Sequence, residues 1–147
     1  MFIAIASLAA LAGCGDKAST MDDFTSTEVT LPNGAKLVCK VMRADIDLTR
    51  GLMFVDSLPS NHGMLFEFIR QQPHPEWMYQ HKFAIDTIWM DDNHEIDEIV
   101  FNMPPCTSKV AHECPHYGGQ RNSRYMLEVP AGVARQQHLK IGDKLDF

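Results

Sequence analysis

Two cysteines and two histidines with spacing suited to chemistry lie in the segment PPCTSKVAHECPHY. Cys106 and Cys114 are eight residues apart, and each has a proline beside it. In an exported protein this pair is most simply a disulfide that closes a loop, worth about 2–3 kcal/mol. The alternative is a metal site, because His112 and His116 flank Cys114, and two thiolates with two imidazoles satisfy tetrahedral zinc. The spacing does not resemble a known zinc motif, so we predict the disulfide and expect no metal or cofactor.

Asp86 is the candidate for acid–base chemistry. It lies in the apolar stretch 85–90, where strand alternation places it on the same face as Ile88. A carboxylate among apolar side chains is costly unless it is hydrogen-bonded or paired, so Asp86 has either a structural partner or a chemical role. We favour the structural alternative, with Arg50 and Arg124 as candidate partners.

Four large aromatic or sulfur-containing side chains are candidates to line a pocket: Trp77, Met78, Tyr117 and Tyr125. Such residues beside strands are more often part of the core. The sequence contains no Ser-His-Asp signature, phosphate-binding glycine loop, HExxH or dinucleotide fingerprint. Five histidines lack metal-ligand spacing and are expected at surface or turn positions: His62, His74, His81, His94 and His138. Cys39 is expected to be a buried thiol.

The elements that position these residues belong to one domain. The chain has 147 residues, 45% of them hydrophobic and 22% charged, which suits a single globular domain. The formal charge of −6 argues against nucleic-acid binding. No apolar run approaches the roughly 20 residues that span a bilayer.

The N-terminal residues indicate export. Residues 1–13 carry no charge and match the apolar core of a secretory signal, although no basic residue precedes that core. They end in Leu11-Ala12-Gly13-Cys14, which resembles the lipobox of bacterial lipoproteins. The resemblance implies cleavage before Cys14 and a lipid on its thiol. Residues 14–27 are small and polar and predict a flexible tether. We therefore expect lipid anchoring in the bacterial cell envelope, facing the periplasm or the exterior, with the leaflet left open.

Short apolar runs separated by turn residues follow Glu28. Asn33-Gly34 between apolar stretches predicts a hairpin, and Asp45 is expected to cap a short helix. The predicted strands are 28–31, 35–41, 63–68, 85–90, 95–101, 125–129 and 144–147, and the predicted helices are 45–52 and 131–139. This pattern indicates a single α+β domain over 28–147, with a mostly antiparallel, barrel-like sheet and two short helices.

Read in order, these segments resemble the family known as domain of unknown function 192. The matching pieces are Leu31-Pro32-Asn33-Gly34, Arg50-Gly51-Leu52-Met53-Phe54, Leu58-Pro59, Gly63-Met64-Leu65-Phe66, Trp77-Met78, Ile85-Asp86, Pro104-Pro105-Cys106, Cys114-Pro115, Tyr117-Gly118, Arg124-Tyr125, Leu127-Glu128-Val129-Pro130-Ala131-Gly132 and Leu139-Lys140-Ile141-Gly142-Asp143. The resemblance implies a compact β-rich domain and no activity. After Trp-Met the family usually continues with Lys-Asn-Thr and an apolar-Pro step, whereas residues 79–84 read YQHKFA here. If that stretch lines a pocket, this chain's ligand differs.

The leading hypothesis is an envelope lipoprotein that binds an unknown ligand or protein and is not an enzyme. The candidate binding residues are Trp77, Met78, Asp86, Arg50, Arg124 and Tyr125. One alternative is an envelope enzyme with Asp86 as acid/base and Arg50 or Arg124 binding an anionic substrate. Another is a metal-binding protein that uses Cys106, His112, Cys114 and His116. The sequence leaves the oligomeric state open.

Overall fold

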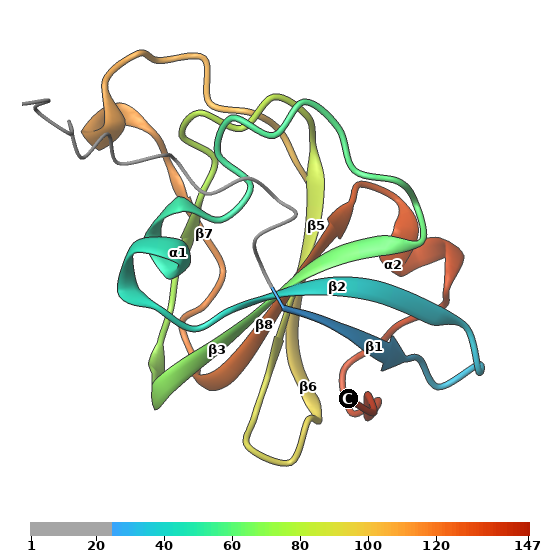
Figure 1. The fold of residues 1–147 in the computed structure, drawn as a ribbon. Helices are drawn as coiled ribbons and strands as arrows, with labels where there is room; N and C mark the ends of the chain where they lie inside the picture. The colour runs from blue at the N-terminus through green and yellow to red at the C-terminus, as the bar shows by residue number, and fades with distance from the viewer. Residues whose placement is uncertain (1–24) are drawn as a thin grey trace, which may run out of the picture.

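A computed structural model describes residues 25–147, which form a curved six-stranded sheet with two short helices (Figure 1). The elements in chain order are β1 (Ser26–Thr30), β2 (Lys36–Met42), α1 (Asp45–Arg50), β3 (His62–Pro73), β4 (Glu76–Trp77), β5 (Ile85–Met90), β6 (Ile96–Met103), the 3-10 turn η2 (Ala111–Glu113), β7 (His116–Tyr117), β8 (Asn122–Pro130) and α2 (Val133–Gln136). The large sheet has the order β1-β2-β3-β8-β5-β6, and only β2 and β3 run parallel. The predicted α+β class and mostly antiparallel sheet are confirmed, but the sheet does not close into a barrel.

The predicted hairpin between β1 and β2 is confirmed. Thr30 pairs with Lys36, and the Asn33 side-chain oxygen accepts a hydrogen bond from the Ala35 amide across the turn. Gly34 takes the positive φ that this turn requires. A second hairpin joins the strands predicted over 85–90 and 95–101, which are β5 and β6, and the Asp91 carboxylate in its turn accepts hydrogen bonds from the amides of residues 93 and 95.

Each face of the sheet carries its own apolar layer, because successive residues of a strand point to opposite sides. Leu127 belongs to the layer that contains β1, α2 and the C-terminal segment. Met126 belongs to the other layer, with Phe66 and Trp89. Figure 1 shows α1 and α2 at opposite sides of the central strands. The second layer is the one that positions the site described below.

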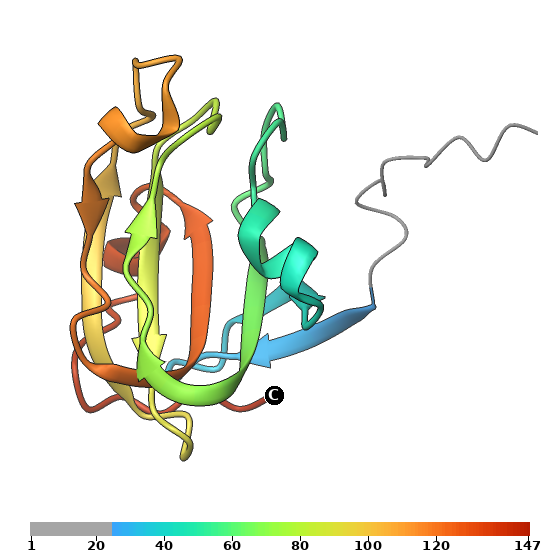
Figure 2. The same ribbon diagram turned by 90° about the vertical axis from the view of Figure 1, so that its left-hand side faces the viewer.

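The long strand β3 bends where its pairing with β8 changes register between Glu67 and Gln72, and Figure 2 shows this curvature. After the bend the chain enters β4, which pairs with β7 in a separate two-stranded sheet that the sequence pattern does not predict. The disulfide Cys106–Cys114 joins the segments on either side of η2, as predicted. Together these features fold the 73–81 segment back over the sheet.

Other details differ from the sequence predictions. β1 begins at Ser26, inside the predicted tether, because residues 26 and 27 extend the pairing with β2. Asp45 is the first residue of α1, and the N-cap position is Ala44, without a side-chain cap. The predicted strand 144–147 contributes only two isolated bridges, through Lys144 and Asp146. Within 25–147, no helix has the length and apolar character needed to cross a membrane. The predicted signal peptide and the predicted lipid-bearing Cys14 lie outside the described residues.

Candidate functional site

A pocket of about 330 Å³ opens between α1 and the small β4–β7 sheet. Its walls come from six segments of the chain: α1 with Gly51, the middle of β3, the 73–77 connector with β4, His81 after β4, the β7 strand, and Met126 of β8. Aromatic rings line much of it, including Phe66, Phe68 and Trp77. A concave site with apolar walls and a few converging polar groups is the usual form of a small-molecule site.

Glu128 is the most unusual residue beside this pocket. It lies in β8, between β3 and β5, and only 1% of it is exposed. Neither of its carboxylate oxygens has a hydrogen-bond partner. Burial raises the pKa of Glu128 well above the usual value, and the nearby charge of Glu76 raises it further. A buried carboxylate left without donors is expensive and is rare without a functional reason.

Glu76 and His81 face Glu128 from a different part of the chain. One ligand atom from each of the three residues lies within 4.8 Å of the others. His81 is 8% exposed and its Nδ1 has no hydrogen-bond partner, while Glu76 is half-buried and lines the pocket. Burial lowers the pKa of His81 to about 4 and raises that of Glu76 to about 8. Two carboxylates and one neutral imidazole are a donor set that could hold a divalent cation.

The local backbone brings these residues together. Met78 is fully buried, and its carbonyl accepts hydrogen bonds from the amides of His81 and Cys106, which ties the 78–81 turn to the disulfide loop. The carbonyl of Gln80 accepts a hydrogen bond from the amide of Phe54. The turn is therefore held from two sides. His81 lies in a turn, as the sequence predicts, but it is buried and not at the surface.

Glycines allow two close approaches at the pocket. Gly51 has φ +44°, and a Cβ there would lie 3.0 Å from the Phe66 ring and 3.7 Å from a Glu128 oxygen. Gly119 has φ +61°, and a Cβ there would lie 2.1 Å from the carbonyl oxygen of His74. These two positions accept only glycine, since any side chain would collide or strain the backbone. Gly51 thus brings the pocket wall close to Glu128, and Gly119 lets the backbone pack directly against His74 of the connector.

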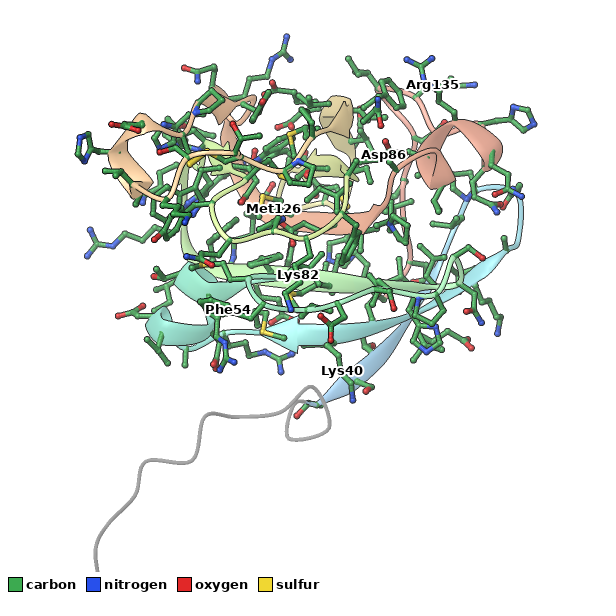
Figure 3. The ribbon with its side chains drawn as sticks, turned by 90° about the horizontal axis from the view of Figure 1, so that it is seen from above. Lys40, Phe54, Lys82, Asp86, Met126 and Arg135 are labelled. Carbon is green, nitrogen blue, oxygen red and sulfur yellow. A yellow bond between two sulfur atoms is a disulfide. The ribbon has the colours of Figure 1, made fainter. Side chains whose placement is uncertain are left out.

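Asp86 lies elsewhere, and its carboxylate is fully engaged. It is 0% exposed; one oxygen accepts the amide of Asn102, and the other accepts the amides of Gly132 and Ala134. Figure 3 shows Asp86 beside α2, and it does not line the pocket. These three backbone donors are the structural partners, in place of the two arginines that the sequence suggested. The alternative enzyme, with Asp86 as acid/base, has no open site at this residue.

The other predicted binding residues divide between pocket and core. Trp77 and Arg50 line the pocket, and Trp77 stacks with His116 at a ring-centre separation of 6.1 Å. Met78 is a core residue. Arg124 and Tyr125 do not line the pocket. Tyr125 packs against the rings of His94 and Phe147, and the Arg124 guanidinium lies 5.5 Å from the Tyr125 ring centre.

The alternative metal site built on two cysteines is wrong, because Cys106 and Cys114 are bonded to each other. A disulfide sulfur cannot act as a thiolate ligand. His112 and His116, which would have completed that site, are exposed. Cys39 is buried and unbonded, as predicted, and burial raises the pKa of its thiol to about 12.

Sequence reasoning missed Glu76, His81 and Glu128. A signal for Glu128 was present, since it interrupts the apolar stretch 125–129 in the same way that Asp86 interrupts its own strand. His81 falls in the stretch 79–84, where the sequence departs from the family pattern. No local signal marks Glu76, because a two-residue strand carries no periodicity.

Comparisons with known proteins agree on the fold. The model of the domain of unknown function 192 family, described as "Uncharacterized ACR", matches residues 28–147. The chain is similar to the crystal structure of a "putative transcription regulator" from Sinorhizobium meliloti 1021, with a TM-score of 0.74 and 24% identity over 84% of this chain and 94% of that one. A protein of unknown function from Novosphingobium aromaticivorans DSM 12444 is similar with a TM-score of 0.69 and 20% identity over 90% of this chain and 100% of that one. No curated protein matches the chain. At these identities the two structures show the fold alone.

Proposed function

We propose that this chain, which belongs to the domain of unknown function 192 family, is a lipid-anchored binding protein of the bacterial envelope that holds a small ligand in the pocket beneath α1. The observation that carries the proposal is the pocket itself. It has aromatic walls, and polar side chains from separate segments converge on it, including Thr49, Glu76 and His81. This combination suits a ligand with a flat apolar part and a hydrogen-bonding group.

The aromatic walls favour planar ligands. Phe68 and His74 stack with ring centres 3.5 Å apart, and Trp77 presents a second ring system to the same space. The ligand class that fits is therefore a small heteroaromatic acid or amine.

Trp77 provides the test of the pocket. We would screen a panel of small heteroaromatic acids and amines by ligand-observed NMR against a soluble form beginning at residue 15. Fragments that bind should lose most of their affinity for Trp77→Ala and keep it for Tyr125→Ala. Tyr125 is the matched control because it is a half-buried ring outside the pocket. Binding that is equal in the two variants, or no binding at all, contradicts the proposed pocket.

The anchor is proposed from the lipobox-like sequence that ends at Cys14. Several acyl chains on one residue hold a protein to a membrane, because each buried methylene contributes about 0.8 kcal/mol. Mass spectrometry of the protein expressed in a bacterial host should find a chain that begins at Cys14 and carries the lipid mass. Cys14→Ser should remove that mass and retain residues 1–13. An N-terminus at another residue, or an unmodified Cys14, contradicts lipidation.

A further inference from the structure

We propose that Glu76, His81 and Glu128 bind one divalent first-row transition-metal ion at the inner end of the pocket. The inference deepens the proposed function, because it assigns part of the ligand chemistry to the same pocket. It starts from Glu128, which is 1% exposed and whose two oxygens have no hydrogen-bond partner. A carboxylate in that position needs a proton or a cation to balance it.

The surroundings of Glu128 favour a cation over a hydrogen-bonding partner. The groups that approach it are a second carboxylate, Glu76, and the imidazole of His81, with their ligand atoms within 4.8 Å of each other. Two carboxylates at this separation repel each other when both are ionised. A divalent cation between them removes that repulsion and satisfies both. It also gives the unpartnered Nδ1 of His81 a role.

The donor set indicates the class of metal. Oxygen ligands alone suit Mg²⁺ and Ca²⁺, whereas an imidazole beside carboxylates suits Zn²⁺ and its first-row neighbours. A neutral imidazole is the form that coordinates a metal, and the buried position of His81 favours that form. Zn²⁺ is therefore the first ion to test, with Co²⁺ as its spectroscopic substitute.

The position of the cluster links the ion to the pocket. Glu76 and His81 both line the cavity, so an ion held by them would face its interior. Three protein ligands leave a fourth position of a tetrahedral site open for water or for a pocket ligand. An acid bound in the pocket could then coordinate the metal through its carboxylate. The same open position is what distinguishes a binding or reactive site from a purely structural one.

The test uses the protein as it is purified from a bacterial host, stripped with EDTA and dialysed. Titration calorimetry with ZnCl₂ should give one ion per chain, and elemental analysis after gel filtration should recover it. Glu128→Gln and His81→Thr should each weaken Zn²⁺ binding by at least about 100-fold. Co²⁺ should give visible bands typical of oxygen and nitrogen ligands, and both variants should abolish them.

Matched controls are Glu95→Gln and His112→Gln, an exposed carboxylate and an exposed imidazole outside the cluster. They should bind Zn²⁺ as the unmodified protein does. Glu128→Gln preserves shape while removing charge, and near-UV circular dichroism would verify its fold. Absence of Zn²⁺ and Co²⁺ binding, or binding that both cluster variants retain, overturns the metal site and leaves a shared proton as the explanation. Heteroaromatic fragments that still bind in that case would preserve the proposed pocket function, whereas Zn²⁺ binding without fragment binding would preserve only the metal site.

Discussion

Asp86 and Glu128 are two buried carboxylates at adjacent register positions of one strand pair, and their surroundings are opposite. Asp86 pairs with Val129, and Thr87 pairs with Glu128, so the two carboxylates point to different faces of the sheet. Asp86 accepts three backbone amides, whereas Glu128 accepts no hydrogen bond. Burial alone therefore does not separate a structural acid from a functional one in this sheet. The two differ instead in the number of hydrogen-bond donors that reach the carboxylate.

The largest expected effect tests the structural half of the comparison. Asp86→Asn should lower the free energy of unfolding by about 3 kcal/mol, because an amide cannot accept all three N–H groups and places a donor against one of them. Urea denaturation would measure the change. A loss within about 0.5 kcal/mol would mean that Asp86 is no more important than an ordinary surface residue.

Removal of the disulfide should disturb the site of Glu128 more than the site of Asp86. Replacing Cys106 and Cys114 by serine should lower the free energy of unfolding by about 2 kcal/mol. The amide of Cys106 donates a hydrogen bond to the carbonyl of Met78, which also holds the turn that carries His81. Loosening the disulfide loop should therefore weaken Zn²⁺ binding as well, by about tenfold. Hydrogen exchange of the Gly132 and Ala134 amides, which Asp86 holds, should stay slow in the native ensemble. Faster exchange of the Gly132 and Ala134 amides together with unchanged Zn²⁺ binding would mean that the disulfide supports the Asp86 site and not the Glu128 site.

Glu128→Gln should have the opposite sign from Asp86→Asn. In the metal-free protein it should raise the free energy of unfolding by about 1–2 kcal/mol at neutral pH, because a neutral amide replaces a buried carboxyl that must either keep its proton above the usual glutamate pKa or stay ionised without donors. Thermal and urea unfolding in EDTA would measure this gain. Added Zn²⁺ should stabilise only the unmodified protein. A destabilised Glu128→Gln in EDTA would indicate hidden partners for the carboxylate.

The smallest effect is a pH dependence of the metal-free protein. The pKa of Glu76 is raised to about 8 and that of Glu128 is raised as well, so the folded state binds more protons than the unfolded state above the usual glutamate range. Their contribution to stability is present at low pH and is lost as the pH rises toward 8. The lowered pKa of His81 has the opposite effect between about 4 and 6.5.

Stability in EDTA should therefore decline with pH between 6.5 and 8, where the glutamates act without His81. Chemical denaturation across this range would show the decline, and Glu76→Gln combined with Glu128→Gln should flatten it. A double variant with the original slope would place the titrating groups elsewhere. Asp86→Asn is expected to retain the decline of stability with pH, in contrast to the double glutamate variant.

Much of the fold is predictable from local signals. The Asn33-Gly34 turn, the apolar strands and the paired cysteines each carry their information within a few residues, and the structure confirms them. The edges of elements are less predictable, because strands extend for as long as neighbours offer hydrogen bonds. β3 continues to Pro73 around a register shift that the sequence does not mark.

The site is less predictable than the fold. Glu128 interrupts an apolar strand just as Asp86 does, and sequence alone does not show which of the two carboxylates finds hydrogen-bond donors. The donors of Asp86 are backbone amides of residues 102, 132 and 134, and a backbone amide has no signature in sequence. Glu76 and His81 reach Glu128 only because the segment after β3 folds back over the sheet, which is a property of the whole chain.

The position of β8 between β3 and β5 has a consequence for the order of folding. β8 is the last strand of the large sheet to appear along the chain, yet it joins the two parts of that sheet. A chain that crosses a membrane N-terminus first cannot complete this sheet until residues 122–130 have emerged. The pairings of β8 with β3 and β5 join residues far apart in the sequence, and such long-range pairings form slowly. The strand order thus delays completion of the sheet until β8 has emerged, and the same late strand delivers Glu128 to its site.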